Sequence, residues 1–178
     1  MQAAELHKSV GQTYDGYPYE LHLKAVVALC KKHLNLIDEE DLKQALHFLP
    51  GFSVYALHYF KKDIVRAAEF HDSIEDARLT YNDLAGEFNQ CVAELVYRCT
   101  NEKGRNREER ASNRFYSELK EINAAVFIKA CDRLANMYYS KMMNSSLYWK
   151  YVKEYPKFKE KLFIEKYQPI FDEIETLL

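Results

Sequence analysis

Residues 70–76 read Phe-His-Asp-Ser-Ile-Glu-Asp. His71 and Asp72 are adjacent in this stretch, and two more carboxylates, Glu75 and Asp76, follow within about one helical turn. Neutral imidazole and carboxylate groups are good ligands for divalent metal ions. If the segment is helical, Glu75 lies on the same side as His71 and Asp72. The stretch therefore indicates a helix that carries two metal ligands beside two groups able to transfer protons.

The sequence around this motif has apolar residues at three- and four-residue spacing, which is typical of helices. Glycine and proline are scarce, with five and four among 178 residues. Thr80 is expected to cap a helix that has Asp83 in its first turn, and a break is expected at Pro50-Gly51. We expect helices near residues 2–10, 19–34, 38–48, 60–74, 80–98, 111–122, 123–143, 146–164 and 167–177. These features predict an all-α fold with a single domain over residues 1–178.

Composition narrows the function classes. The chain has 25 basic and 27 acidic residues and a net charge of −2, so it lacks the basic excess of proteins that bind nucleic acid polymers. We expect no membrane partner, because no apolar run reaches membrane-spanning length. The N-terminus lacks signal-peptide features, and a cytoplasmic location is expected. The four cysteines show no CxxC spacing and are expected to be reduced and buried. They are Cys30, Cys91, Cys99 and Cys131.

A histidine and an aspartate in distinctive local sequence flank the motif, with His22 upstream and Asp132 downstream. A site of two histidines and two aspartates leaves coordination positions open for water and a phosphate oxygen. Mixed nitrogen and oxygen ligands favour manganese, iron, zinc, cobalt or nickel over calcium and magnesium. Each residue also has a simpler interpretation, since His22 can be a packed core residue and Asp132 can form an ion pair with Lys129 or Arg133.

The order and local context of these residues resemble the HD-domain metal-dependent phosphohydrolases. Three segments carry the resemblance: Gly-x-Pro-Tyr-x-x-His at 16–22, His-Asp-x-x-Glu-Asp at 71–76 and Lys-x-x-Asp-Arg-Leu-x-Asn at 129–136. They are most similar to the hydrolase domain of RelA/SpoT-type alarmone enzymes and its small stand-alone animal relatives, over about residues 5–145. The resemblance implies an HD-domain helical bundle that removes the 3′-pyrophosphate from guanosine tetra- or pentaphosphate, (p)ppGpp.

The resemblance also implies a role for individual residues. It makes Glu75 and Asp76 the catalytic pair that serves the attacking water, and it gives Asn136 and Lys103 a role in holding the nucleotide. Relatives with two or more metals use additional histidines, and no histidine follows His71, so a single ion is expected, with manganese first. The implied metal ligands are His22, His71, Asp72 and Asp132.

Other segments suggest substrate contacts. Residues 100–114 are strongly polar, and we expect at least one of Lys103, Arg105 and Arg107 to bind phosphate, although a solvated loop is the usual interpretation of such a run. Tyr19 belongs to a matched segment and is a candidate for stacking on a purine, although most aromatic residues serve core packing.

The chain departs from the family pattern in three places. Gln12-Thr13-Tyr14-Asp15 stands where basic residues usually precede the first motif. A helical segment at about 35–60 is inserted between His22 and His71. We expect part of residues 37–60, with Tyr55 and Tyr59, to cover or flank the site; a structural extension of the core is the alternative. A helical extension follows at about 146–178, with no synthetase domain.

Two other functions are compatible with the same residues. One is an HD nucleotidase or phosphatase that acts on another nucleotide. The other is a non-catalytic helical module that binds nucleotides. Release of pyrophosphate rather than orthophosphate would distinguish the (p)ppGpp hydrolase from the nucleotidase or phosphatase. Failure to bind metal would favour the non-catalytic module.

Overall fold

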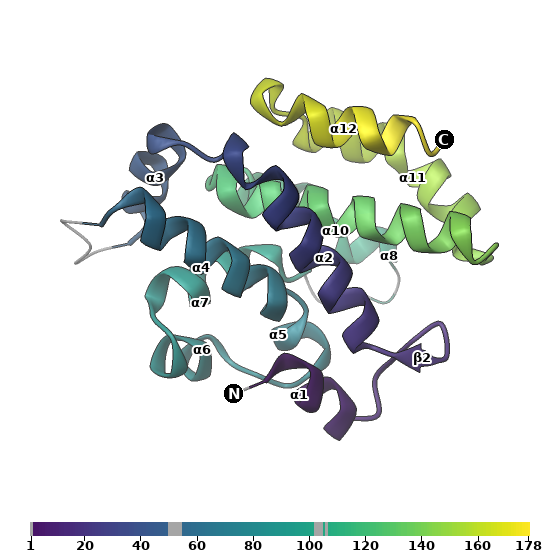
Figure 1. Cartoon of the computed structure of the whole chain (residues 1–178), viewed down its shortest axis with the longest axis horizontal. Coiled ribbons are helices and arrows are strands. Elements are labelled where there is room, and N and C mark those ends of the chain that lie inside the picture. Colours follow the sequence, from purple (N-terminus) through teal and green to yellow (C-terminus); the bar gives the residue numbers. More distant parts are fainter. Residues whose placement is uncertain (1, 50–54, 102–104, 106) are drawn as a thin grey trace.

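The computed structural model describes residues 2–49, 55–101, 105 and 107–178, except for the side chains at 107 and 108. The described chain is all-α apart from one small hairpin, β1 (Thr13–Tyr14) and β2 (Tyr17–Pro18) (Figure 1). Its α-helices are α1 (Ala3–Ser9), α2 (Glu20–His33), α3 (Glu39–Leu46), α4 (Leu57–Phe70), α5 (Ser73–Asp76), α6 (Tyr81–Glu87), α7 (Gln90–Cys99), α8 (Arg107–Arg110), α9 (Asn113–Leu119), α10 (Asn123–Met142), α11 (Leu147–Leu162) and α12 (Gln168–Glu175). Two short 3-10 helices, η1 (Leu34–Leu36) and η2 (Glu165–Tyr167), complete the set.

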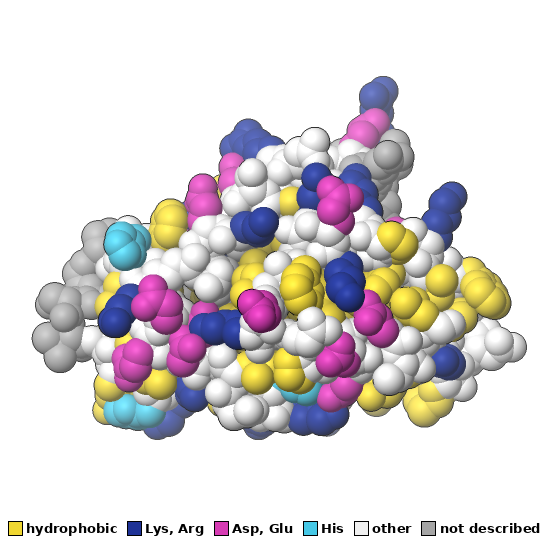
Figure 2. Space-filling view, turned by 90° about the horizontal axis from the view of Figure 1, so that it is seen from above, with side chains coloured by type: hydrophobic (Ala, Val, Ile, Leu, Met, Phe, Trp, Pro, Cys, Tyr) yellow, Lys and Arg dark blue, Asp and Glu magenta, His cyan; other side chains and the backbone are white. Residues whose placement is uncertain are grey.

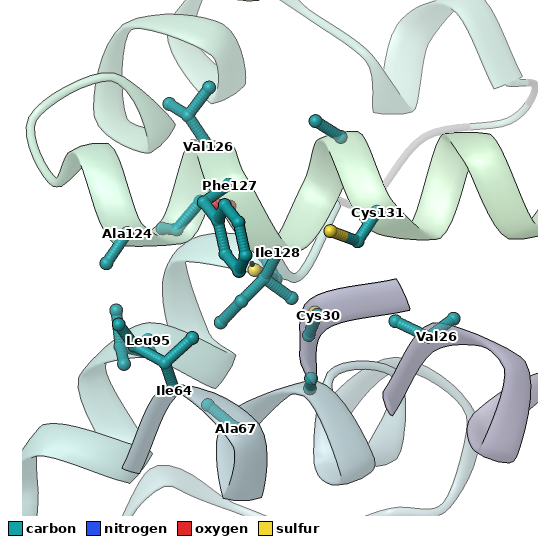
Figure 3. Close-up of a cluster of buried hydrophobic side chains, with 14 of the residues drawn as sticks. Val26, Cys30, Ile64, Ala67, Leu95, Ala124, Val126, Phe127, Ile128 and Cys131 are labelled. Atoms are coloured by element: carbon teal, nitrogen blue, oxygen red, sulfur yellow. Dashed lines mark hydrogen bonds between the residues drawn. The ribbon is translucent and has the colours of Figure 1, made fainter. Parts of the chain in front are cut away.

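The hydrophobic core is built around α10. This helix packs against α2, α4 and α7 and also against α11 and α12. Figure 3 shows Phe127 and Ile128 of α10 extending toward Ile64 of α4 and Leu95 of α7. Fully burying a side chain of this size contributes about 1.5–3 kcal/mol. The core therefore fixes α2 and α10, which carry His22 and Asp132, and α4, which ends just before His71 and Asp72.

Two predicted helices are interrupted. The helix expected at 60–74 ends at Phe70, and His71 and Asp72 form a turn before α5 begins. Asp72 has φ −101° and ψ 2°, outside the helical region, so the prediction that Glu75 shares a helical face with His71 and Asp72 is wrong. The helix expected at 80–98 is divided between α6 and α7.

Capping explains where these helices begin. Thr80 and Asp83 form the expected capping interaction at the start of α6, with each side chain accepting from the backbone N–H of the other residue. Asn89 then begins α7: its extended backbone cannot continue α6, and its side chain accepts from the backbone N–H of Val92 at 2.9 Å. An asparagine in this position satisfies an N–H group that the helix leaves unpaired.

The β1–β2 hairpin was not predicted. Its strands are joined by Asp15 and Gly16, both with positive φ (53° and 85°). This is the backbone that a two-residue hairpin turn requires, and Asp-Gly is among the sequences that favour it. The turn places Tyr14 against α2 and α10, where its ring stacks on His22 with the ring centres 4.7 Å apart.

The inserted segment packs against the C-terminal part of the chain. Asp41 of α3 is fully buried. It accepts a hydrogen bond from Tyr167 at 3.1 Å and pairs with Lys166 at 2.9 Å, and Asn123 donates to it at 3.2 Å. A buried carboxylate is stable only when its oxygens are paired in this way. These contacts tie α3 to η2 and to the start of α10.

The described chain has a mixed surface. On the face shown in Figure 2, basic and acidic side chains are interspersed. All four cysteines are free and buried, as the sequence predicts. Among the described helices, none combines the length and the hydropathy that crossing a membrane requires.

Candidate metal centre

Four side chains from three parts of the chain converge beside the core. His22 lies in the first turn of α2, His71 and Asp72 occupy the turn after α4, and Asp132 lies in the middle of α10. Both histidines and Asp132 are buried, and Asp72 is partly buried. The interruption after Phe70 lets two adjacent residues turn their side chains toward one point, which a continuous helix would not allow.

The ligand atoms of His22, His71 and Asp72 all lie within 4.8 Å of one another, which is the spacing of a metal site, and Asp132 lies next to both histidines. His71 Nε2 lies 3.0 Å from Asp72 Oδ2, and His22 Nε2 lies 3.3 Å from both His71 Nε2 and Asp132 Oδ1. His22 Nε2 lies 3.6 Å from Asp72 Oδ2, and His71 Nε2 lies 3.7 Å from Asp132 Oδ1. Ligand atoms bound about 2.1 Å from one ion are about 3.0 Å apart in octahedral and about 3.4 Å apart in tetrahedral geometry.

The donor set also has the charge that suits a cation. His71 Nδ1 lies 2.8 Å from the carbonyl oxygen of Ala68, which can only accept, so Nδ1 carries the proton. In the neutral imidazole, Nε2 then presents its lone pair to a carboxylate of Asp72 and to His22. Lone pairs facing one another at these distances need a positive charge between them, supplied either by protons or by a metal ion. The residues present therefore fit a divalent ion.

The pKa values of the cluster describe its metal-free state. Burial by itself lowers the pKa of an imidazole, but the charge of Asp72 and hydrogen bonds to Asp132 and Asp72 raise the pKa of His71 to about 10. Burial opposes ionisation of Asp132, yet Lys129 and the two histidines hold its pKa well below the ordinary value. Without metal, His71 therefore stays protonated at neutral pH.

Neighbouring side chains fix the ligands in place. Tyr19 donates to Asp72 at 2.5 Å, and Lys129 pairs with Asp132 at 3.1 Å. Asn136 donates to Asp132 Oδ1 at 2.7 Å and in turn accepts from Tyr14 at 2.7 Å. Such outer contacts orient metal ligands and restrict their rotamers. His22 is less constrained, because its buried Nδ1 has no hydrogen-bond partner within the described part of the chain.

Two further carboxylates face the same space. Glu75 accepts from Asn101 at 3.1 Å and lies 3.5 Å from Arg110. Asp76 accepts from Gln12 at 3.0 Å. Burial, with the charges of Asp72 and Glu75, raises the pKa of Asp76 to about 6. A carboxylate with a pKa near neutrality is suited to accept and return protons.

A cavity of about 720 Å³ opens beside the cluster. Its lining includes the candidate metal ligands His22, Asp72 and Asp132, together with Glu75 and Asp76. Residues of α11 and Arg133 of α10 also line it. Sites for small ligands commonly have volumes of about 300–1,000 Å³, so a mononucleotide fits this space.

Some of the residues predicted to contact the substrate line the cavity, and others do not. Tyr19 and Asn136 line the cavity. Arg105 does not line it: its side chain is 91% exposed and pairs with Glu109 at 3.2 Å. Lys103 and the side chain of Arg107 lie outside the described residues. From the same polar segment, Arg110 does reach the cavity.

The inserted segment does not cover the site within the residues described. None of its described residues, 35–49 and 55–60, lines the cavity. Tyr55 instead donates to Asp63, and Tyr59 is 52% exposed. The expectation that Tyr55 and Tyr59 flank the site is wrong, and the alternative of a structural extension agrees with the buried contacts of Asp41.

The structure adds residues to the site that sequence reasoning missed. Tyr14 reaches Asn136 because of the hairpin turn, and the Asp15-Gly16 pair was the signal for that turn. Gln12 and Asn101 orient the two acids. The lysines of α11 gave no local signal, since a basic amphipathic helix usually faces solvent.

Comparison with known proteins identified no relative: no protein-family model, curated protein or solved structure matches the chain.

Proposed function

We propose that this protein is a metal-dependent phosphohydrolase that acts on a small nucleotide, with the 3′-pyrophosphate of (p)ppGpp as the leading substrate. One observation supports this function above all others. The ring nitrogens of His22 and His71 lie 3.3 Å apart and 3.0–3.7 Å from carboxylate oxygens of Asp72 and Asp132, beside a cavity whose lining also includes Glu75 and Asp76. The family resemblance of the three sequence segments supplies the nucleotide and the position of the bond.

The metal ligands and the two acids have separate roles in this proposal. His22, His71, Asp72 and Asp132 would hold one divalent ion, with manganese first and iron, zinc, cobalt or nickel as alternatives. A bound ion would supply Lewis acidity and lower the pKa of water. Asp76 is the proton acceptor because its pKa is already near 6.

Glu75 positions the attacking water beside Asp76. Its two oxygens are held by Asn101 and Arg110, which orients the carboxylate toward the cavity. Arg110 is 47% exposed, so its guanidinium is able to turn from Glu75 to a phosphate oxygen. Asn136 and Tyr19 complete the wall beside the metal ligands.

The experiment is a nucleotide screen on protein reconstituted with manganese. The purified protein is loaded with one equivalent of Mn²⁺ and incubated with guanosine tetra- and pentaphosphate and with nucleoside mono-, di- and triphosphates, and products are identified by mass. We expect pyrophosphate and a guanosine 5′-phosphate. Release of orthophosphate from other nucleotides would instead favour the nucleotidase. Turnover of no nucleotide by metal-loaded protein would contradict the proposal and favour a binding module.

A further inference from the structure

Three lysines on one side of α11 line the cavity that the candidate metal ligands also line. Lys150, Lys153 and Lys157 all line it. They are spaced by three and four residues, which places them next to each other on one helix surface. Within the described part of the chain, none of the three ammonium groups has an ion-pair or hydrogen-bond partner.

The other basic side chains that line this cavity are paired, and one of them, Arg110, lies 3.5 Å from Glu75. Lys129 pairs with Asp132 at 3.1 Å, and Arg133 pairs with Glu154 at 3.1 Å. Arg133 also lies over the rings of Tyr151 and Phe158, 5.0 Å and 4.8 Å from their centres. The guanidinium of Arg133 is thus held in the cavity wall by these contacts. The uncompensated positive charge therefore belongs to the three lysines of α11.

Such an arrangement is unfavourable without an anion. Like charges at three- and four-residue spacing on a helix repel each other and destabilise it. Elsewhere on α11, Lys159 and Lys161 have acidic partners, Glu175 and Glu160. The unpaired lysines are thus confined to the side that faces the cavity. An anionic ligand there would remove the repulsion.

We propose that Lys153 and Lys157, with Lys150 beside them, bind a second phosphate group of the substrate, remote from the group that reacts at the metal ligands. This inference rests on the proposed function and extends it. It defines the substrate as a nucleotide phosphorylated at two positions. The scissile group lies at the cluster of His22 and Asp72, and the other phosphate lies against α11.

The test compares two charge-matched double variants. Lys153→Gln/Lys157→Gln removes two cavity lysines, and Lys159→Gln/Lys161→Gln removes two lysines from the same helix outside the cavity. The substrates are guanosine 5′-diphosphate 3′-diphosphate and guanosine 3′-diphosphate without 5′ phosphates. For the cavity variant, we expect KM to rise about tenfold for the first substrate and by less than twofold for the second, with unchanged kcat. The control variant should match wild type for both.

An equal rise in KM for both substrates, or no rise for either, would overturn the inference. A second measurement separates this failure from failure of the proposed function. Inorganic pyrophosphate is titrated calorimetrically into metal-free wild type and both variants. We expect about tenfold weaker binding by the Lys153→Gln/Lys157→Gln variant alone. If that holds while no nucleotide is hydrolysed, the anion site stands and the phosphohydrolase function fails; equal binding by all three proteins overturns the anion site.

Discussion

At the scale of single residues, Asp72 connects the two histidines of the candidate metal centre. Its Oδ2 lies 3.0 Å from His71 Nε2 and 3.6 Å from His22 Nε2, and it accepts a hydrogen bond from Tyr19. Replacing it with asparagine keeps the size and removes the charge. We expect Asp72→Asn to fold normally but to lose most bound metal and nearly all activity.

The measurement is metal content by mass spectrometry after dialysis, together with circular dichroism. Asp172→Asn is the matched control, because Asp172 is exposed on α12 and does not line the cavity. Retention of full metal content and full activity by the Asp72→Asn protein would remove the metal centre from the proposal.

Substitution of Glu75 tests the rate of the chemical step rather than metal binding. Its carboxylate faces the cavity and is held by Asn101 and Arg110. Glu75→Gln should leave metal content unchanged and slow turnover by about 10²–10⁴-fold, because a positioned acid–base group contributes about this much. Single-turnover rates on metal-loaded protein provide the measurement. A rate near that of wild type would assign the role to Asp76 alone.

The histidines predict how metal binding depends on pH. The pKa of His71 rises from 6.5 to about 10 in the metal-free fold, and the pKa of His22 is raised as well. A metal ion that binds in the neutral pH range must therefore displace the proton of His71. Metal affinity should rise by about tenfold per pH unit for each proton released.

The metal-free protein should show the opposite trend. Its raised His71 pKa contributes stability that is complete below pH 6.5 and is lost as pH rises toward about 10. The difference in Tm between metal-loaded and metal-free protein should thus widen from pH 6 to pH 8.5, as measured by calorimetry. A constant difference, or one that narrows, would show that these histidines do not hold the ion.

At the scale of elements, the β1–β2 hairpin determines where Tyr14 lies. Gly16 has φ +85°, and a Cβ added there would meet no atom within 4 Å, so Gly16→Ala tests backbone strain alone. We expect a loss of about 1 kcal/mol and a fall in Tm of about 2–4 °C.

Gly86 in α6 is the matched control for Gly16. It also has open space around an added Cβ, but its φ is not positive. Gly86→Ala should raise stability by about 0.4–1 kcal/mol, because alanine favours a helix and restricts the unfolded chain. The same sign for both substitutions in thermal unfolding would contradict this account of the hairpin.

At the scale of the whole molecule, the inserted segment acts on stability rather than on the site. Asp41→Ala would leave Tyr167 and Asn123 without their acceptor. We expect a loss of about 2 kcal/mol in urea unfolding with unchanged metal affinity. Glu40→Ala, on the exposed side of the same helix, should change stability by less than about 0.5 kcal/mol. Weaker metal binding by Asp41→Ala would show that the insertion does shape the site.

The sequence by itself determined the helical class and most helix positions. Apolar periodicity is a local property, so α2, α10 and α11 begin and end within a few residues of the predicted ranges. Thr80 and Asp83 were likewise sufficient to predict the start of α6. The resemblance of the segments around His22, His71 and Asp132 selected four side chains, and the fold brings them close together.

Only the tertiary structure decided the breaks within predicted helices and the walls of the cavity. The turn at His71 and Asp72 interrupts a sequence whose periodicity continues, because packing of α2 and α10 fixes where both side chains must point. The lysines of α11 line the same cavity as the candidate metal ligands because α11 packs on α10, although Lys150 stands 18 positions after Asp132 in the sequence. Local sequence carries propensity and period, whereas juxtaposition depends on how the buried faces of distant helices fit together.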